Sequence, residues 1–183
     1  MVTVPRIAAV SCFGTVPFVY GMQHAADLHA ELSLSDPAET VRRFAARQAD
    51  IALVPAVVVP SLGDARIVTE YCVGAAESAR AAVEGCDDPL VDLWRPYGEL
   101  PFAFAVWVAR PDVGADCIEA LQHALTFGLE HGYEALIASD AGADAAAYAA
   151  LMQFDYLYDS QKRLALEKFW AEGLKVAPRA NPG

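Results

Sequence analysis

The feature that most constrains the fold is a short apolar strand near the start of the chain that runs directly into a turn and a helix. Residues 5–12 alternate little between apolar and polar side chains, which indicates a central strand of a sheet. Gly14 breaks the strand, Thr15 can cap a helix, and Pro17 lies in the first helical turn, where no N–H is needed. A strand–turn–helix junction of this kind is where an open α/β sheet binds small anions.

The rest of the chain alternates strands and helices. We expect strands over residues 31–34, 50–54, 65–73 and 100–109, and helices over 16–23, 36–48, 75–83, 114–131, 133–152 (with a weak point at Gly142) and 159–173. This order predicts an α/β fold, with a mostly parallel open sheet and helices on both faces. Phe102 and Phe104 would share one face of the last strand and Trp107 the other, so both faces of the sheet should be covered. With 183 residues, 55% of them hydrophobic, the chain suits a single domain over residues 1–183.

The charge of the chain excludes some classes of partner. The net charge is −11 and no basic stripe is present, which argues against a nucleic-acid partner. The same negative field would repel an anionic substrate, so local donors such as hydroxyls and helix N-termini would have to bind it.

Other sequence signals argue against a membrane, a secretion signal and a metal. No apolar run is long enough to span a membrane, and the first residues lack the pattern of a secretion signal, so we expect a cytoplasmic protein. The cysteines are scattered and the histidines lack metal-ligand spacing, which indicates reduced thiols and no metal site. These residues are Cys12, Cys72, Cys86, Cys117, His24, His29, His123 and His131.

The sharpest local signal for binding is the segment that contains Ser11, Gly14 and Thr15. A hydroxyl at the end of a strand, a glycine, and then a hydroxyl with free amides at a helix start could hold a carboxylate. The alternative is that Gly14 only shapes the turn and Thr15 only caps the helix. Val54 and Pro55 end the second buried strand and would touch the same ligand, or they only close that strand.

Two further groups of residues could carry chemistry, but each has a simpler structural interpretation. Asp92, Tyr97 and Glu99 precede the last strand and could act as acids or bases, although a solvated approach to the strand explains them better. Four aromatic residues near the third long helix could form a stacking surface, but without interleaved basic residues they favour core packing. These are Tyr148, Phe154, Tyr156 and Tyr158.

Several stretches resemble the futalosine-pathway menaquinone biosynthesis family, in its chorismate dehydratase branch. The matching stretches are residues 6–21, 49–55, 67–74 and 100–110, in the family's order, and residues 156–174 look like its final helices. The resemblance implies two α/β lobes like those of periplasmic binding proteins, with the ligand between them. It also implies a lyase that eliminates water from chorismate to give 3-[(1-carboxyvinyl)oxy]benzoate, with no cofactor. The expected partner is then a small, chorismate-like anion.

The chain differs from the family pattern in ways that leave two functions open. The family carries asparagine at the position of Gly14, and its catalytic serine segment has no convincing match here, since Ser78 does not fit the pattern. Residues 75–92 are too short to build the second lobe and would form a linker in its place. We therefore expect the chain to resemble one lobe of a type II periplasmic-binding-protein-like fold. It would be a chorismate dehydratase-like hydro-lyase with unassigned catalytic residues, or a small-carboxylate-binding module or degenerate family member without turnover. A face left bare by the missing lobe would favour a homo-oligomer.

Overall fold

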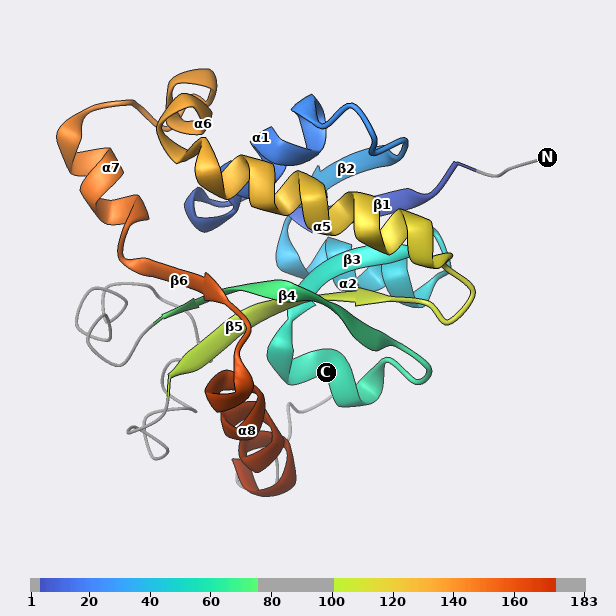
Figure 1. Cartoon of the computed structure of the whole chain (residues 1–183). Helices are drawn as coiled ribbons and strands as arrows, with labels where there is room; N and C mark the ends of the chain where they lie inside the picture. Colours follow the sequence, from blue (N-terminus) through green and yellow to red (C-terminus); the bar gives the residue numbers. More distant parts are fainter. Residues whose placement is uncertain (1–3, 76–100, 174–183) are drawn as a thin grey trace.

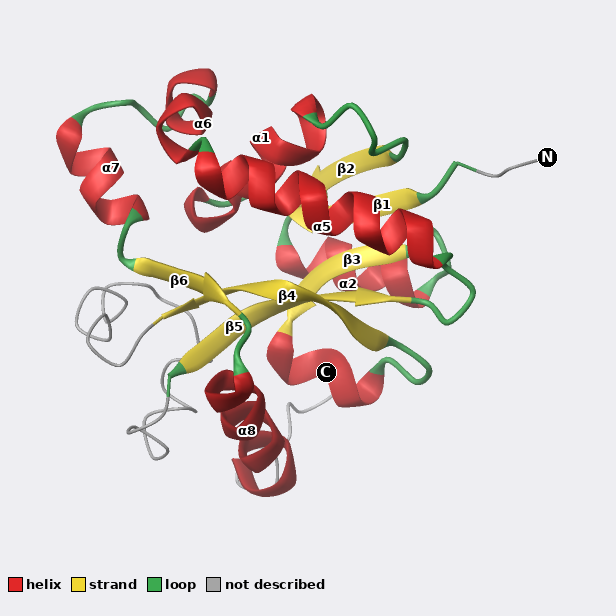
Figure 2. Ribbon diagram, in the orientation of Figure 1, coloured by secondary structure: helices red, strands yellow, loops and turns green. Residues whose placement is uncertain are grey.

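A computed structural model describes residues 4–75 and 101–173, which form one open six-stranded sheet between two layers of helices (Figures 1 and 2). The order of strands across the sheet is β2-β1-β3-β5-β4-β6. The strands are β1 (Arg6–Val10), β2 (Glu31–Ser35), β3 (Ile51–Pro55), β4 (Arg66–Ala75), β5 (Phe102–Ala109) and β6 (Phe154–Leu157). The α-helices are α1 (Val16–His24), α2 (Pro37–Ala45), α5 (Ala115–Glu130), α6 (Gly132–Ala138), α7 (Ala145–Leu151) and α8 (Ser160–Lys168). Short 3-10 helices are η1 (Phe13–Thr15) and η2 (Ala56–Ser61), and a π-helical turn, η5 (Phe169–Gly173), follows α8.

The sheet is mixed. β1 pairs in parallel with β2 and β3, whereas β5 is antiparallel to both β3 and β4, and β6 is antiparallel to β4. It follows that β1 to β4 all point the same way and that their carboxyl ends share one edge of the sheet. The α/β class and the open sheet with helices on both faces are confirmed, but the expected mostly parallel pairing is corrected to a mixed one. A strand covered on both faces has the same apolar run whether its neighbours are parallel or antiparallel, so the sequence pattern did not reveal the direction of β5.

The core has two halves, one on each face of the sheet. On one face, Phe18 of α1 and Leu121 of α5 pack against Trp107 of β5, and all three are fully buried. On the other face, Phe44 of α2 and Leu166 of α8 join a second buried cluster. Phe102 and Phe104 belong to this second cluster, with their rings edge to face at 4.7 Å. The expected division of aromatic residues between the two faces is therefore confirmed.

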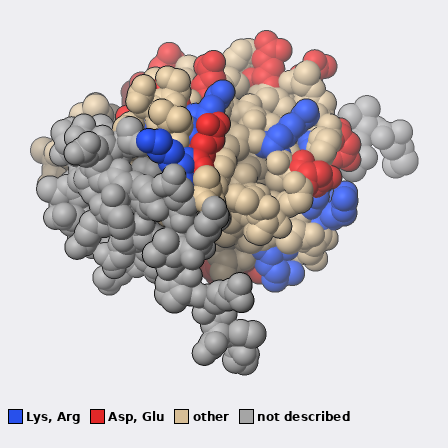
Figure 3. Space-filling view, turned by 90° about the horizontal axis from the view of Figure 1, so that it is seen from below, with Lys and Arg blue, Asp and Glu red and all other residues tan. Residues whose placement is uncertain are grey.

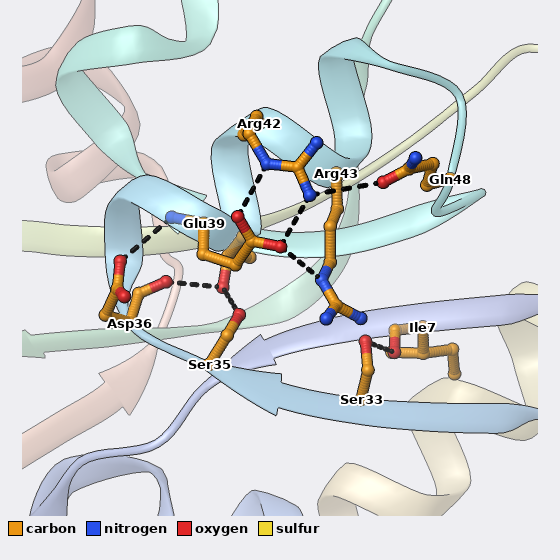
Figure 4. Close-up of polar contacts among 9 residues, drawn as sticks. Ile7, Ser33, Ser35, Asp36, Glu39, Arg42, Arg43 and Gln48 are labelled. Carbon is orange, nitrogen blue, oxygen red and sulfur yellow. Dashed lines mark hydrogen bonds and ion pairs between the residues drawn. The ribbon is translucent and has the colours of Figure 1, made fainter.

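The start of α2 follows the local rules of its sequence. The Asp36 carboxylate accepts a hydrogen bond from the Glu39 N–H at 2.9 Å, and Pro37 occupies the first helical turn. The Glu39 carboxylate binds the guanidinium groups of Arg42 and Arg43 (Figure 4). These hydrogen bonds lower the pKa of the Glu39 carboxyl group to about 2, and the bond from Arg42 has the larger effect. The predicted helix start is confirmed, but the helix ends at Ala45, three residues before the expected end.

The last third of the chain is less helical than the sequence indicates. The helix expected over 133–152 is divided into α6 and α7. Gly142, the predicted weak point of that helix, lies between them with a φ of 86°. Phe154 and Tyr156, for which the sequence indicated only packing, belong to β6 at the edge of the sheet beside β4. This strand places Phe154 and Tyr156 next to the turn that follows β1, as described below.

Some predictions fall outside the described residues. The predicted helix over 75–83 and the predicted linker over 75–92 lie outside them, except for Ala75, which is described. The individual residues outside them are Ser78, Cys86, Asp92, Tyr97 and Glu99. Within residues 4–75 and 101–173, no helix has the length and apolar character needed to cross a bilayer.

Candidate functional site

Thr15 locks the turn that follows β1. Its hydroxyl, 1% exposed, lies 2.7 Å from the Val10 carbonyl oxygen and 2.8 Å from that of Cys12, and it accepts the Cys12 N–H at 3.1 Å. The hydroxyl hydrogen and one of the two lone pairs are therefore used within the turn. The side chain of Thr15 stabilises the turn, and because it makes no hydrogen bond that caps α1, the expected side-chain cap is corrected.

Ser11 and Cys12 lie on the open side of the same turn. The Ser11 N–H donates to the Ser35 carbonyl at the end of β2 at 2.9 Å, while the Ser11 side chain is exposed. Both residues line a pocket of about 330 Å³, here called the β1 pocket, between the carboxyl end of β1, α1 and the end of α6. The polar residues that line it besides Thr15 are Ser11, Cys12, Tyr20, Gln23, Ser139 and Asp140.

Gly14 faces β6 rather than open space. A Cβ at this position would lie 2.9 Å from the Phe154 ring and 3.1 Å from Cγ1 of Val73. The Tyr156 hydroxyl donates to the Gly14 carbonyl at 2.9 Å. Burial raises the pKa of Tyr156 far above its ordinary value, so this phenol remains a protonated donor. Gly14 is therefore a point of close contact between the first turn and the last strand.

Val54 and Pro55 lie at the same edge of the sheet, since β3 runs parallel to β1. Val54 is fully buried opposite Val106, and Pro55 pairs with Ala105 and leads into η2. Neither residue lines the β1 pocket. Of the five residues expected to form one site, the structure brings Ser11 and Thr15 to the β1 pocket and places Gly14, Val54 and Pro55 outside its lining.

Besides Cys12, four polar residues of the pocket are absent from the site that the sequence indicated. Tyr20 and Gln23 are one helical turn apart on α1, a spacing that could have placed them on one face. Ser139 and Asp140 come from the end of α6, and no local pattern connects them with β1. The Asp140 carboxylate is the one charged group among the residues that line the pocket. It could accept a proton there, and it would also repel a carboxylate placed close to it.

Two cysteines differ sharply in accessibility. Cys12 is exposed at the β1 pocket, whereas Cys72 is buried within β4. Burial raises the pKa of the Cys72 thiol to about 12, so its reactive thiolate form is scarce near neutral pH. Cys12 can therefore report on the pocket by its rate of alkylation. In the described part of the chain, His, Cys, Asp and Glu residues form no group of three that could hold a metal ion.

No protein-family model and no curated protein matches the sequence. Protein AF1704 from Archaeoglobus fulgidus has a similar structure, with a TM-score of 0.69 at 15% identity over 92% of this chain and 97% of that one. The Candida albicans CA3427 gene product, described as exhibiting the generic periplasmic binding protein structural fold, has a TM-score of 0.63 at 12% identity over 98% of this chain and 93% of its own. The chain has a periplasmic-binding-protein-like fold.

A third structure agrees with this conclusion. An ABC transporter protein from Parabacteroides distasonis has a TM-score of 0.63 at 12% identity, covering 96% of this chain and 94% of its own. Identities of 12 to 15% indicate likeness of fold alone. The expected periplasmic-binding-protein-like fold is thus confirmed, while the two-lobed arrangement, the family itself and its reaction remain predictions.

Proposed function

We propose that this chain binds chorismate or a closely similar small dicarboxylate in the β1 pocket, as a relative of the chorismate dehydratases of futalosine-pathway menaquinone biosynthesis. The observation that carries the proposal is the position of the pocket at the carboxyl end of β1. The chain passes from β1 to β2 on one side and then to β3 on the other, so the strand order reverses at β1. Open α/β sheets bind ligands at such reversal points. The collinear resemblance to the family supports this choice of ligand.

The pocket residues can be assigned roles in binding and in the elimination of water. The Ser11 hydroxyl and the Gln23 amide can donate to a carboxylate, because both are uncharged donors at the pocket. An elimination also needs a base that takes a ring proton, and that proton, passed on from the protonated base, can join the departing hydroxyl group so that water is released. Asp140 is the group at the pocket that could act as this base.

The second candidate function is carboxylate binding without turnover. Two contacts favour it. Phe154 fills the space beside Gly14 where the family has an asparagine side chain, and the Thr15 hydroxyl is used within its own turn. The two functions share the same pocket, so one set of measurements can separate them.

We expect chorismate to bind saturably and to slow the alkylation of Cys12, because the ligand and this thiol share the pocket. Calorimetric titration would measure binding, peptide mapping would follow Cys12, and loss of the ultraviolet absorbance of chorismate would measure turnover. Ser11→Ala should weaken binding about tenfold, since a hydrogen bond to a charged group is lost.

Ser61→Ala is the matched control, because the Ser61 hydroxyl donates to the Val58 carbonyl in η2, outside the β1 pocket. Loss of absorbance would select the lyase, and binding without such loss would select the module. Absence of both binding and Cys12 protection would refute the proposal in either form.

We expect Gly14→Asn to destabilise the protein by about 1–3 kcal/mol without creating dehydratase activity. The new side chain must displace the Phe154 ring, which lies 2.9 Å from the Cβ position. In a Phe154→Ala background, Gly14→Asn should no longer cause the part of the stability loss that comes from the clash with the Phe154 ring. Gly114→Asn is the control, because nothing lies within 4 Å of a Cβ there. Denaturant unfolding gives the stability, and measurable chorismate turnover by the single Gly14→Asn variant would contradict the expectation.

A further inference from the structure

Two short helices expose an apolar ridge to solvent. Tyr133 and Ile137 of α6 are 50% and 59% exposed, and Tyr148 of α7 and Met152 just after it are 41% and 64% exposed. Each pair is four residues apart, so its members lie on the same face of their helix. The rings of Tyr133 and Tyr148 meet edge to face at 5.9 Å, which joins the two pairs into one surface. We call these four residues the α6–α7 ridge.

The sequence around the ridge carries charge of a single sign. Between Arg110 and Lys162 there is no lysine or arginine, whereas there are nine aspartates and glutamates. Glu130, the last residue of α5, and Glu134 of α6 are both exposed. The underside of the molecule as drawn in Figure 1, seen in Figure 3, shows residues of both signs side by side. The ridge thus lies in the part of the chain where acidic residues have no basic neighbours in sequence.

This combination identifies the chemistry of a partner. We propose that the α6–α7 ridge docks a lysine- or arginine-rich protein segment that presents apolar side chains, such as a basic amphipathic helix. Tyrosine side chains are frequent anchors in interfaces, because they bury a large apolar area and keep a polar tip. The exposed carboxylates of Glu130 and Glu134, close in sequence to Tyr133, attract a cationic segment and repel an anionic one. An anionic membrane surface and a second copy of this chain, with its net charge of −11, fit the ridge less well for the same reason.

The ridge and the β1 pocket both include residues of the α6 region, but they share no residue. Ala135, Ala138 and Ser139 of the α6 region line the β1 pocket, whereas Tyr133 and Ile137 do not. Docking on the ridge can therefore be tested without disturbing the pocket lining.

The test uses the full chain and a labelled helical peptide of about 18 residues, with leucine on one face and lysine on the other. Fluorescence anisotropy would measure its dissociation constant, and a leucine–glutamate peptide of equal length would serve as the anionic counterpart. We expect the lysine peptide to bind and the glutamate peptide not to bind. Raising the salt from about 50 to about 500 mM should weaken binding severalfold, since exposed charges are screened.

Variants separate docking on the ridge from general attraction to an acidic protein. The double substitution Tyr133→Ser with Ile137→Ser should weaken binding of the lysine peptide roughly tenfold or more. Glu134→Lys should weaken it about threefold or more through charge alone. Leu164→Ser is the control, because Leu164 is a 45% exposed apolar residue on α8.

Three results would overturn the proposal: no binding of the lysine peptide, equal binding by the ridge variant and the control, or a dimer in sedimentation that the ridge variant abolishes. The last result would make a second copy of the chain the occupant of the ridge.

Discussion

Gly128→Ala is expected to lower the free energy of unfolding by about 3 kcal/mol or more, a large fraction of the stability of a domain of this size. Gly128 lies where α5 crosses α1, and a Cβ there would be 1.9 Å from the Pro17 carbonyl oxygen. The same crossing leaves no room at Gly21, where a Cβ would be 2.0 Å from the Ala124 carbonyl oxygen. Both obstacles are backbone atoms, which cannot rotate away as a side chain can. The two helices would have to separate, and that would loosen the packing of Phe18 and Leu121 on this face of the sheet.

Gly114→Ala is the matched control for this substitution. Gly114 precedes the same helix α5 with a φ of −65°, and nothing lies within 4 Å of a Cβ there. Its replacement should change stability little, whereas Gly128→Ala should shift the midpoint of urea denaturation strongly. Similar midpoints for the two variants would show that α1 and α5 do not cross as closely as described.

The second large effect is expected at a buried ion pair between α8 and β6. The Lys162 side chain is 0% exposed, and its ammonium donates to Asp155 Oδ2 and to the Leu157 carbonyl, both at 2.7 Å. Asp155→Asn keeps the shape of the side chain but leaves the buried ammonium without its counter-charge. Loss of one partner of such a pair costs about 3–5 kcal/mol.

Lys162→Met should be much milder, below about 2 kcal/mol, because it removes the buried charge and keeps an apolar stem of similar length. The remaining Asp155 carboxylate is 33% exposed and can be hydrated. In the Lys162→Met background, Asp155→Asn should therefore add little. Unfolding free energies of the four proteins form a double-mutant cycle. Equal losses for the two single variants would contradict this account.

Local rules were sufficient to predict much of the first half of the fold. The start of α2 followed from Asp36 and Pro37, because a capping carboxylate and an N-terminal proline act within a few residues of each other. β6 was missed for the opposite reason. Its four residues form a strand by pairing with β4, which lies some eighty positions earlier in the sequence.

The candidate site was only partly predictable from the sequence. Two interpretations of the Thr15 hydroxyl were open, and its hydrogen bonds to Val10 and Cys12 depend on the conformation of the turn. The sequence marked Gly14 as a departure from the family pattern, but it did not indicate which residue occupies the space beside it. That residue, Phe154, comes from the opposite end of the described chain, as do Ser139 and Asp140 at the pocket.

The hydrogen bond from Tyr156 to the Gly14 carbonyl has a consequence for folding during synthesis. The two residues are 142 positions apart, so β6, which is made later in synthesis, completes the surroundings of a turn made much earlier. The turn must therefore wait until β6 has been made before its final contacts can form. Contacts between such distant residues slow folding and prolong the exposure of apolar surface. Chaperone dependence of the newly made chain is the cellular consequence to expect from this single long-range link.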